Sequence, residues 1–337
     1  MHSFYSDKHR LHNTDGVRLG DHPFITDEIP ARADILLDAV RAANFGPVLE
    51  PSDFGLEPIL AVHDAGFVEH LRAVYDASAR LYQRAEPVFV STFSPRSAQR
   101  RARGIVGQTG YYAYGVGSPI LEGTWEAAYW SAQCALAAAS RVRAGDRAAY
   151  ALCRPPGHHA AADLYGGFCY LNNAAIAARS LGKQVAILDI DYHHGNGTQL
   201  IFYNDPDVLF CSLHADPDDD YPYYWGGADE QGSGAGTGLN RNWPLPQNTG
   251  DADYLAALDE AIAVVASFAP RYLIVSAGFD TIAGDPVGGF RLSTPGLRDV
   301  GQRIAMLGVP VVIVQEGGYL LERLAESAVA FLSPFVE

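Results

Sequence analysis

The stretch V-A-I-L-D-I-D-Y-H-H, residues 185–194, begins as an apolar run and ends in carboxylate and imidazole side chains. Short, uninterrupted runs of Val, Ile and Leu are typical of strands buried on both faces of a parallel sheet. If the strand stays extended through these residues, Asp189, Asp191 and His193 point to one face, because side chains alternate along a strand. Such groups are costly to bury beside an apolar strand unless they pair or bind a cation.

Similar apolar runs recur along the chain and alternate with helical patterns. Strands are predicted over Ala148–Cys153, Val185–Asp191, Val208–Leu213, Tyr272–Ala277 and Val309–Gln315. Helices are predicted over Trp125–Ala144, Asn172–Leu181, Tyr254–Phe268 and Pro295–Leu307. This alternation indicates an α/β protein whose βα units wind into an open parallel sheet. Ligands of such sheets bind outside the carboxyl ends of the strands, where polar residues follow the apolar runs of this chain.

A second carboxylate follows a later apolar run, in S-A-G-F-D at residues 276–280. Asp191, His193 and Asp280 would supply three nitrogen and oxygen ligands and leave a fourth position open for water, as a catalytic zinc site requires. The alternative is three buried polar residues satisfied by backbone groups. That account suits one buried aspartate better than several acidic and imidazole groups on one face, so we favour the metal.

Two more polar segments follow predicted strands. R-P-P-G-H-H, residues 154–159, has two prolines that stiffen the turn before the paired imidazoles of His158 and His159. Adjacent histidines beside a metal site are suited to general acid–base work, although such a pair alone is more often part of an ordinary loop. E-G-G-Y, residues 316–319, brings the phenol of Tyr319 to the same edge, where it could stabilise an oxyanion.

The first part of the chain is less regular. Helices are expected over residues 30–45 and 66–84, with Asp64 as a possible cap of the second. Residues 86–123 are rich in Pro and Gly and carry the basic residues Arg96, Arg100, Arg101 and Arg103. A solvated loop or a subunit contact is a better interpretation of them than a nucleic-acid patch. Because no repeat or linker interrupts the chain, we expect residues 1–337 to form one domain.

The composition limits the class of protein. With 24 basic and 39 acidic residues the net charge is −15, which disfavours a nucleic-acid partner. The four cysteines lack CxxC spacing and are expected to be buried, reduced thiols of a cytoplasmic protein. We find neither a signal peptide nor an apolar run long enough to span a membrane, so no membrane partner is expected.

Together these segments resemble the zinc-dependent histone deacetylase superfamily. The resemblance rests on R-P-P-G-H-H-A (154–160), G-F-C-Y-L-N-N-A-A (167–175), D-I-D-Y-H-H-G-N-G-T-Q (189–199), S-L-H (212–214), F-D-T-I-A-G-D-P (279–286) and E-G-G-Y (316–319). Their order and spacing match over nearly the whole chain. Local cues such as V-H-D-A-G-F (62–67), G-Q-T-G-Y-Y (107–112) and G-T-W-E-A-A (123–128) are similar to the bacterial acetylpolyamine amidohydrolase branch and its histone deacetylase-like relatives.

The resemblance implies the arginase/deacetylase fold, a single domain with an open eight-stranded parallel sheet and helices on both faces. It implies one zinc ion on Asp191, His193 and Asp280, with water attacking an acetyl carbonyl. His159 would act as general base and then acid, His158 would act electrostatically, and Tyr319 would polarise the carbonyl. Asp189 would orient His158, and Asn196 would orient His159.

Further site residues are implied by the resemblance alone. Structural potassium would bind near Asp189, Asp191, His193, Ser212 and Leu213, and a second potassium ion near Phe202, Asp205 and Val208. The walls of a substrate tunnel would be formed by Gly167, Phe168, Tyr221, Gly317 and Gly318. The segment 86–123 would narrow the cleft and contact a second subunit, which predicts a homodimer.

One departure concerns the substrate. Polyamine-type relatives carry an acid in the loop after G-Y-Y, where this chain has Gly117; Glu122 or the acids of residues 216–220 could substitute. The F-D-T-I-A-G-D-P stretch also reads more like general deacetylases. We therefore expect a hydrolase of small-molecule acetylated amines, foremost acetylpolyamines, with acetyl-lysine peptides or another small amide as alternatives.

Two other possibilities are weaker. A catalytically silent module that binds acetylated ligands is disfavoured because every catalytic-type position is filled. A binuclear manganese ureohydrolase would need doubled Asp-rich motifs that the chain lacks, whereas iron in place of zinc is compatible with the ligand types.

Overall fold

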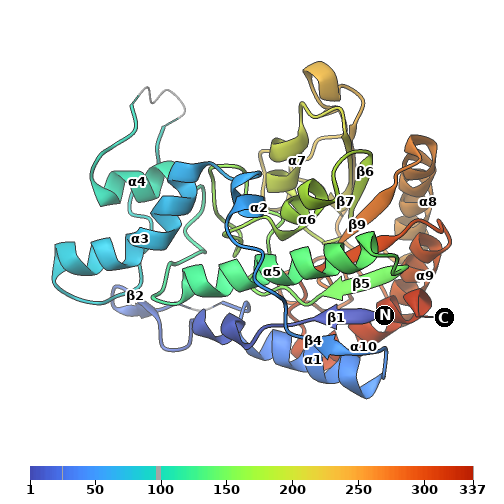
Figure 1. Ribbon diagram of the computed structural model, residues 1–337, viewed down its shortest axis with the longest axis horizontal. Coiled ribbons are helices and arrows are strands. Elements are labelled where there is room, and N and C mark those ends of the chain that lie inside the picture. The colour runs from blue at the N-terminus through green and yellow to red at the C-terminus, as the bar shows by residue number, and fades with distance from the viewer. Residues whose placement is uncertain (25, 96–99, 337) are drawn as a thin grey trace.

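The computed structural model describes residues 1–24, 26–95 and 100–336, and its centre is an eight-stranded sheet (Figure 1). The strand order is β4-β1-β5-β10-β9-β6-β7-β8, and every neighbouring pair is parallel. The strands are β1 His2–Phe4, β4 Val48–Leu49, β5 Ala148–Ala151, β6 Val185–Asp189, β7 Val208–Ala215, β8 Asn240–Leu245, β9 Tyr272–Ala277 and β10 Val311–Gln315. The predicted α/β fold with an eight-stranded parallel sheet is confirmed.

Helices cover both faces of the sheet (Figure 1). The helices are α1 Ala31–Ala42, α2 Glu57–Leu60, α3 Ala65–Tyr82, α4 Ile105–Tyr112, α5 Thr124–Arg143, α6 Asn173–Leu181, α7 Asn196–Phe202, α8 Asp251–Phe268, α9 Thr294–Ala305 and α10 Leu321–Leu332. One hydrophobic core contains residues of α3, α5 and α6, and the other contains residues of α1, α8, α9 and α10. A short hairpin, β2 Arg18–Leu19 with β3 His22–Pro23, lies outside the sheet.

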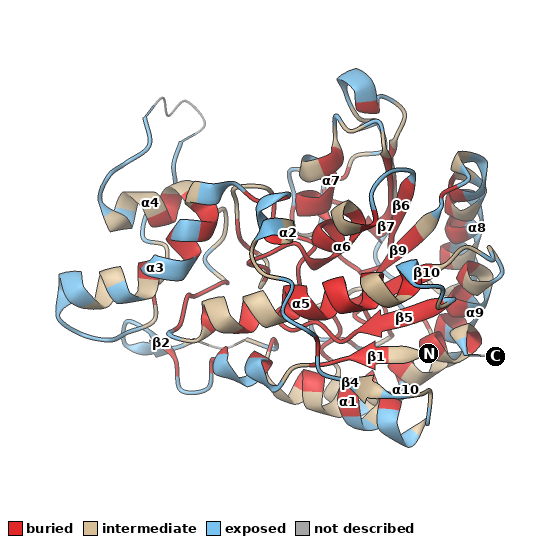
Figure 2. Cartoon of the chain, viewed as in Figure 1, coloured by how far each residue is buried: buried red, intermediate tan, exposed pale blue. Residues whose placement is uncertain are grey.

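The two cores follow from the period of the strands. In β6, Val185 and Ile187 belong to the core on the α5 side, and Ala186 and Leu188 belong to the core on the α8 side. All four residues are fully buried, so β6 needs apolar residues at consecutive positions. Figure 2 shows β5 and β6 coloured as buried. This requirement explains why the central strands could be recognised as uninterrupted apolar runs.

The structure corrects several predicted boundaries. The strand expected over Val185–Asp191 ends at Asp189, so the extended path through His193 is wrong. Here Asp189 Oδ1 accepts the Asp191 N–H at 3.1 Å, and this side-chain hydrogen bond turns the backbone out of the sheet. β7 runs to Ala215, two residues beyond the prediction. The sequence signal did not reveal β1, β4, β8, α2, α4, α7 or α10.

The segment 86–123 is more structured than a loop. It contains α4, which packs on α3 at the end of the molecule away from the two termini (Figure 1). The Asp64 side chain accepts the Phe67 N–H, which confirms the expected cap of α3. Of the basic cluster in this segment, Arg96 lies outside the described residues.

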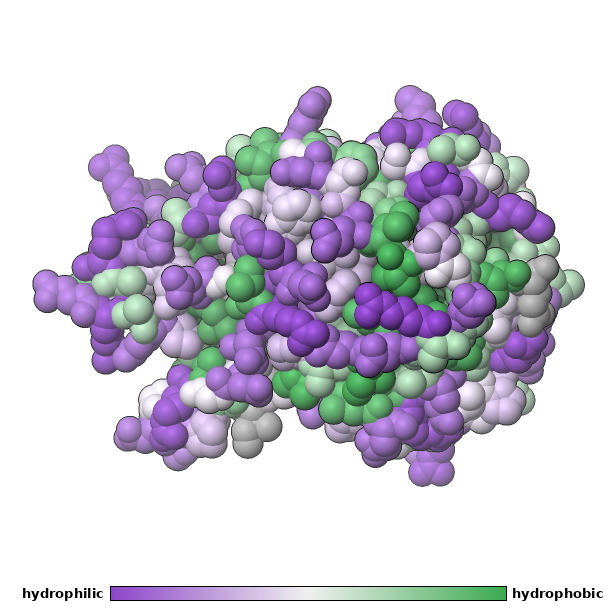
Figure 3. All heavy atoms as spheres, turned by 60° about the horizontal axis from the view of Figure 1, so that its bottom comes forward, coloured by the Kyte–Doolittle hydropathy of each residue, from purple (hydrophilic) through white to green (hydrophobic). Residues whose placement is uncertain are grey.

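No helix in the described ranges is both long and apolar enough to cross a bilayer. On the face of the molecule in Figure 3, hydrophilic residues cover much of the surface and apolar patches lie between them.

Candidate metal and catalytic site

The predicted site residues lie where the strands end, and the turns after β6 bring several of them together. Beyond the turn at Asp189, Asp191 Oδ1 accepts the His193 N–H at 2.9 Å. The N–H of Tyr192 donates to Asp280 Oδ1 at 3.0 Å, which connects this turn to the one after β9. Two successive turns, each closed by a hydrogen bond from a backbone N–H to an aspartate side chain, therefore direct Asp191 and His193 toward Asp280. The sequence had predicted an extended strand at this place.

Asp191, His193 and Asp280 form one compact buried cluster. One potential ligand atom from each lies within 4.8 Å of the others. His193 Nδ1 is 3.2 Å from Asp191 Oδ1 and 3.2 Å from Asp280 Oδ2. These separations suit neighbouring ligands on a single zinc ion, whose bonds to nitrogen and oxygen are about 2.0–2.2 Å. The donor set predicted from the sequence therefore fits a zinc ion.

The electrostatics of the cluster also favour a cation. Burial, together with the negative charge of Asp191, raises the pKa of Asp280 to about 7. Two carboxylates held this close in a buried site repel one another unless a positive charge lies between them. A divalent cation would remove that repulsion, which is a second reason why these residues fit a metal.

His158 is anchored at its ring and at its backbone. Its Nδ1 lies 3.1 Å from Asp189 Oδ2, as the sequence predicted. Glu316 Oε2 accepts the N–H groups of Gly157 and His158 at 2.7 and 3.2 Å. Burial alone would lower the pKa of His158, but the charges of Asp191 and Asp189 outweigh it and raise that pKa to about 10. The carboxylates of Asp189 and Asp191 thus favour the protonated form of His158.

His159 has the opposite environment. Its Nδ1 lies 2.7 Å from Asn196 Oδ1, the predicted partner. Since a carboxamide oxygen only accepts, Nδ1 must carry the proton, and Nε2 of the neutral ring is left as a proton acceptor. Burial, followed by the charges of His158 and His193, lowers the pKa of His159 well below its usual value. The two adjacent histidines are therefore held in different protonation states.

Tyr319 is held by contacts to its backbone N–H and to its ring. Its backbone N–H donates to Asp285 Oδ2 at 2.7 Å, and the guanidinium carbon of Arg32 lies 4.4 Å from its ring centroid. Arg32 also donates to the carbonyl oxygens of Gly318 at 2.6 Å and Glu316 at 2.7 Å. Burial raises the pKa of Tyr319 well above its usual value, so its phenol stays protonated and able to donate.

Three of these residues, His159, His193 and Tyr319, line one cavity of about 350 Å³. Its lining residues are Gly115, Val116, Gly117, His159, Gly167, Phe168, His193, Tyr221, Val287 and Tyr319. The cavity therefore includes three of the five predicted tunnel residues. The other two, Gly317 and Gly318, are not part of its lining. A Cβ at Gly317 would collide with the carboxylates of Asp191 and Asp280, so this position holds the turn against the metal cluster.

The predicted potassium residues form two groups. Asp189 is paired in register with Ser212 across β6 and β7, and Leu213 is the next residue of β7. The second group lies in the turn from α7 to β7, where Asp205 forms an ion pair with Arg179 and accepts the N–H of Asp207. Within each of the two groups, the residues therefore lie close to one another in space.

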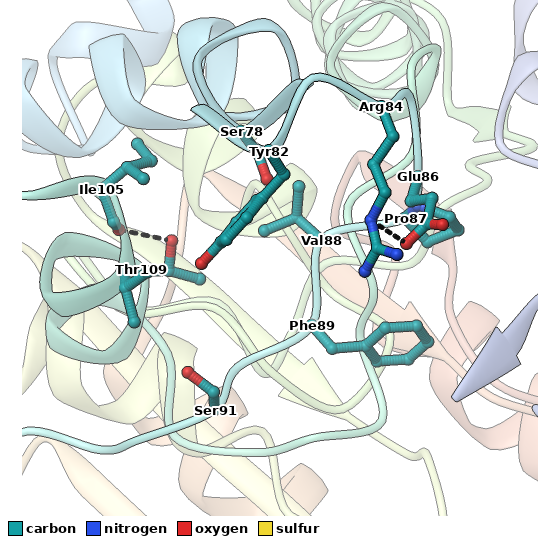
Figure 4. Close-up of a pocket in the computed structure, with 11 residues that line it drawn as sticks. Ser78, Tyr82, Arg84, Glu86, Pro87, Val88, Phe89, Ser91, Ile105 and Thr109 are labelled. Carbon is teal, nitrogen blue, oxygen red and sulfur yellow. Dashed lines mark hydrogen bonds and ion pairs between the residues drawn. The ribbon is translucent and has the colours of Figure 1, made fainter. Parts of the chain in front are cut away.

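A separate hollow of about 160 Å³ lies between the end of α3 and α4 (Figure 4). On its wall Arg84 pairs with Glu86 at 3.0 Å, and the Thr109 hydroxyl donates to the Ile105 carbonyl at 2.9 Å. None of the described residues that line it is a histidine or a cysteine. We assign it no catalytic role.

Sequence reasoning missed several residues around the site. Glu28 precedes the first predicted helix and Arg32 lies near its start, and neither carried a sequence signal for a role at the site, yet Glu28 is buried between Arg32 and Arg154. Val287 of the cavity wall carried none either. Tyr114 had a weak signal as one of several closely spaced tyrosines, and the fold brings its hydroxyl to the backbone carbonyl of His159.

The comparisons place this site in a family. Residues 26–334 match the model of the histone deacetylase domain, and the chain belongs to the histone deacetylase family, whose members are zinc-dependent deacetylases and amidohydrolases.

Similarity to individual proteins shows which members of this family the chain resembles. The chain is 45% identical to acetylpolyamine amidohydrolase 1 of Pseudomonas aeruginosa over 99% of both chains. It is 41% identical to the acetylpolyamine amidohydrolase of Mycoplana ramosa over 95% of both. A crystal structure of acetylpolyamine aminohydrolase from Burkholderia pseudomallei superposes with a TM-score of 0.93 at 42% identity, covering 99% of this chain and 98% of the other.

Proposed function

We propose that this protein removes acetyl groups from small acetylated amines, with acetylpolyamines as its main substrates. The observation that carries the proposal is the zinc-type cluster of Asp191, His193 and Asp280, of which His193 lines the same cavity as His159 and Tyr319. Full-length similarity to acetylpolyamine amidohydrolases supports the choice of amine.

The metal-binding residues would be Asp191, His193 and Asp280. A bound zinc ion would polarise the acetyl carbonyl and lower the pKa of water, and iron would suit the same ligands. His158, whose Nε2 lies 3.8 Å from Asp191 Oδ1, would act electrostatically beside the metal-binding residues.

His159 would move the proton. Its Nε2 would take a proton from the attacking water and then deliver it to the amine nitrogen as the amide C–N bond breaks. The products are acetate and a free amine. Asn196 would keep the Nδ1 proton in place, so that Nε2 remains the reactive atom throughout.

Tyr319 would donate its hydroxyl proton in a hydrogen bond to the carbonyl oxygen as negative charge develops there. Because the loss of one such donor typically costs about 10²–10³ in kcat, Tyr319→Phe should lower kcat by about that factor. Its KM and metal content should change little. Unchanged turnover in Tyr319→Phe or in His159→Ala would remove that residue from the scheme.

The shape of the cavity favours a thin, flexible substrate. Its walls are Phe168, Tyr221 and the two exposed or half-buried residues Val116 and Val287, which suit a methylene chain. None of the described residues that line the cavity is acidic. Gly117 stands on the wall without a side chain, so a distal ammonium group would meet its anionic partner beyond the cavity.

The candidate substitutes for an acid at position 117 are differently placed. Glu122 lines another hollow, together with Glu126. Asp220 accepts hydrogen bonds from the Tyr192 hydroxyl at 2.7 Å and from Gln247 at 3.0 Å. Asp216 is half-buried, and its Oδ1 accepts the Asp218 N–H at 3.0 Å. Asp218 and Asp219 are exposed on the same loop, close in sequence to the wall residue Tyr221, and they are its most accessible candidates to meet a cationic tail.

The deciding experiment compares kcat/KM of the zinc-loaded protein on acetylputrescine and acetylspermidine with that on an acetyl-lysine peptide. A clear preference for the amines would support the proposal. A preference for the peptide would assign the chain to general deacetylation, and activity on bulky acyl amides alone would favour another small amide. One zinc per chain without turnover on any amide would favour a binding module.

Three further features belong to the proposal. Potassium would bind in the two groups described above, and its removal should lower thermal stability. The chain would be a single domain located in the cytoplasm, where its four buried, unpaired cysteines would remain reduced.

The chain would form a homodimer through the segment 86–123, where Phe93, Val106 and Val116 are exposed apolar side chains. A monomer in sedimentation analysis at micromolar concentration would contradict the dimer.

A further inference from the structure

A tyrosine of the segment 86–123 contacts the catalytic pair from outside the cavity. The Tyr114 hydroxyl donates to the backbone carbonyl oxygen of His159 at 3.1 Å and lies 3.4 Å from Asn196 Oδ1. We propose that Tyr114 is a positioning residue that ties His159 to Asn196 and so keeps the imidazole where proton transfer needs it. The proposal rests on the function proposed for His159 above.

The two residues that Tyr114 joins come from different loops. His159 follows β5, and Asn196 begins α7 after β6, so the bond between His159 Nδ1 and Asn196 Oδ1 spans two separate turns. The Asn196 carboxamide is buried, and its Nδ2 has no hydrogen-bond partner in the described part of the chain. Within that part, its hydrogen bonds go to His159 and Tyr114.

Tyr114 can do this because its own position is well defined. Its backbone N–H donates to the Tyr165 carbonyl at 3.2 Å, and the Tyr165 N–H donates to Tyr112 at 2.8 Å. Its ring lies nearly parallel to Tyr221, with centroids 6.3 Å apart, and edge-on to Trp225 at 5.7 Å. Backbone and ring contacts thus hold the hydroxyl in place from both ends.

The packing beneath Tyr114 is also close. A Cβ at Gly166 would come within 2.7 Å of the Tyr114 ring, so the absence of a side chain there allows the ring to approach the histidine loop. Tyr221, against which Tyr114 stacks, meets the His159 ring edge-to-face at 5.0 Å. The segment 86–123 therefore contacts His159 directly through the Tyr114 hydroxyl and indirectly through the ring of Tyr221, which lies between Tyr114 and His159.

Tyr114→Phe isolates the hydroxyl, because it keeps the ring and its stacking. Loss of a hydrogen bond of ordinary strength should lower kcat by about fivefold, with KM changed by less than about twofold. The matched control is Tyr112→Phe, whose buried hydroxyl has no hydrogen-bond partner among the described residues and which should retain the wild-type kcat. Equal kcat values for Tyr114→Phe and wild type would overturn the proposal.

A double-mutant cycle separates positioning from general loosening. If Tyr114 acts through Asn196, Tyr114→Phe should cost much less in an Asn196→Ala background, because the pair it joins no longer exists. An equal loss of kcat in both backgrounds would contradict the proposal and indicate a role in packing alone.

A spectroscopic measurement decides the question without turnover. In the zinc-loaded wild type, the His159 Nδ1 proton should give a downfield, slowly exchanging NMR signal because of its 2.7 Å hydrogen bond. In Tyr114→Phe this signal should move upfield or broaden, whereas Tyr112→Phe should leave it unchanged. If no acetylated amine is cleaved, the proposed function fails, and an unaltered signal in Tyr114→Phe would independently refute the role of Tyr114.

Discussion

The guanidinium group of Arg32 lies under the ring of Tyr319, with 4.4 Å between the guanidinium carbon and the ring centroid. Arg32 is buried, and its charge is balanced by Glu28, whose Oε1 is 3.1 Å away. The same guanidinium binds two carbonyl oxygens of the turn that precedes Tyr319. A residue of α1, far away in sequence, thus supports the candidate oxyanion donor.

Replacing Arg32 should therefore affect turnover through Tyr319. Arg32→Lys keeps the charge but lacks the planar fork that reaches both carbonyls, so kcat should fall about tenfold or more while zinc content stays at one per chain. Arg32→Met should in addition lower stability by about 1.5–3 kcal/mol, because it removes charged hydrogen bonds to Glu28 and to the turn before Tyr319, whereas Arg154 still pairs with Glu28. Urea unfolding and steady-state kinetics test both effects. Wild-type kcat in Arg32→Lys would exclude this support.

The zinc cluster predicts that metal binding stabilises the fold. Adding zinc to chelator-treated wild-type protein should raise its stability by about 2.7 kcal/mol when free zinc exceeds Kd a hundredfold. Asp280→Ala should remove the stabilisation and reduce the zinc content from one per chain to nearly none. Asp259→Asn is the matched control, because Asp259 pairs with Arg303 at the surface. Metal analysis and thermal unfolding would measure both quantities, and full zinc content in Asp280→Ala would refute the ligand assignment.

Position 117 predicts a route to altered specificity. A Cβ at Gly117 would lie 3.9 Å from Phe168 Cε1, an ordinary contact, so the Cβ of a new side chain can be placed at this position of the cavity wall without a clash. Gly117→Glu should increase kcat/KM for acetylspermidine relative to an acetyl-lysine peptide by about two- to fivefold, the range of a solvent-accessible ion pair.

The control for this prediction is Gly117→Gln, which has nearly the same size without the charge. The gain should fall as ionic strength rises, because screening weakens an exposed ion pair. Equal changes in the Glu and Gln variants would mean that shape rather than charge produces the effect.

Buried neutral histidines predict how stability depends on pH. Burial lowers the pKa of His12 and of His63 to about 4, whereas an unfolded histidine titrates near 6.5. Between these values the unfolded chain binds more protons than the folded one. Stability should therefore decrease as pH falls from about 6.5 to about 4, by up to about 1.4 kcal/mol per pH unit for each histidine.

His63→Gln tests this dependence, because a Gln carbonyl can replace the Nε2 that accepts the Asn172 N–H at 2.9 Å. Its free energy of unfolding should depend less steeply on pH in this window than that of the wild type. The measurement is urea unfolding in the presence of a chelator, with the exposed His22→Gln as control. Parallel slopes for His63→Gln and wild type would contradict the prediction.

The elements that could be predicted from the sequence are those whose own residues determine their structure. β6, β9 and β10 are buried on both faces, so their apolar runs were visible and their positions were predicted to within two residues. β4 has only two residues, and the half-exposed β8 contains a proline and an arginine. Such edge strands form because a neighbouring strand offers hydrogen bonds, which no local pattern records.

By itself, the sequence determined the parallel α/β class, the zinc-type donors Asp191, His193 and Asp280, and their place after strands, because side-chain chemistry and strand periodicity are local properties. Tertiary structure alone decided which atoms meet: the turns that replace an extended strand at Asp189, the support of Tyr319 by Arg32 and the contact of Tyr114 with His159. Those contacts join residues far apart in the chain, and their distances depend on how the strands and helices pack around the whole sheet.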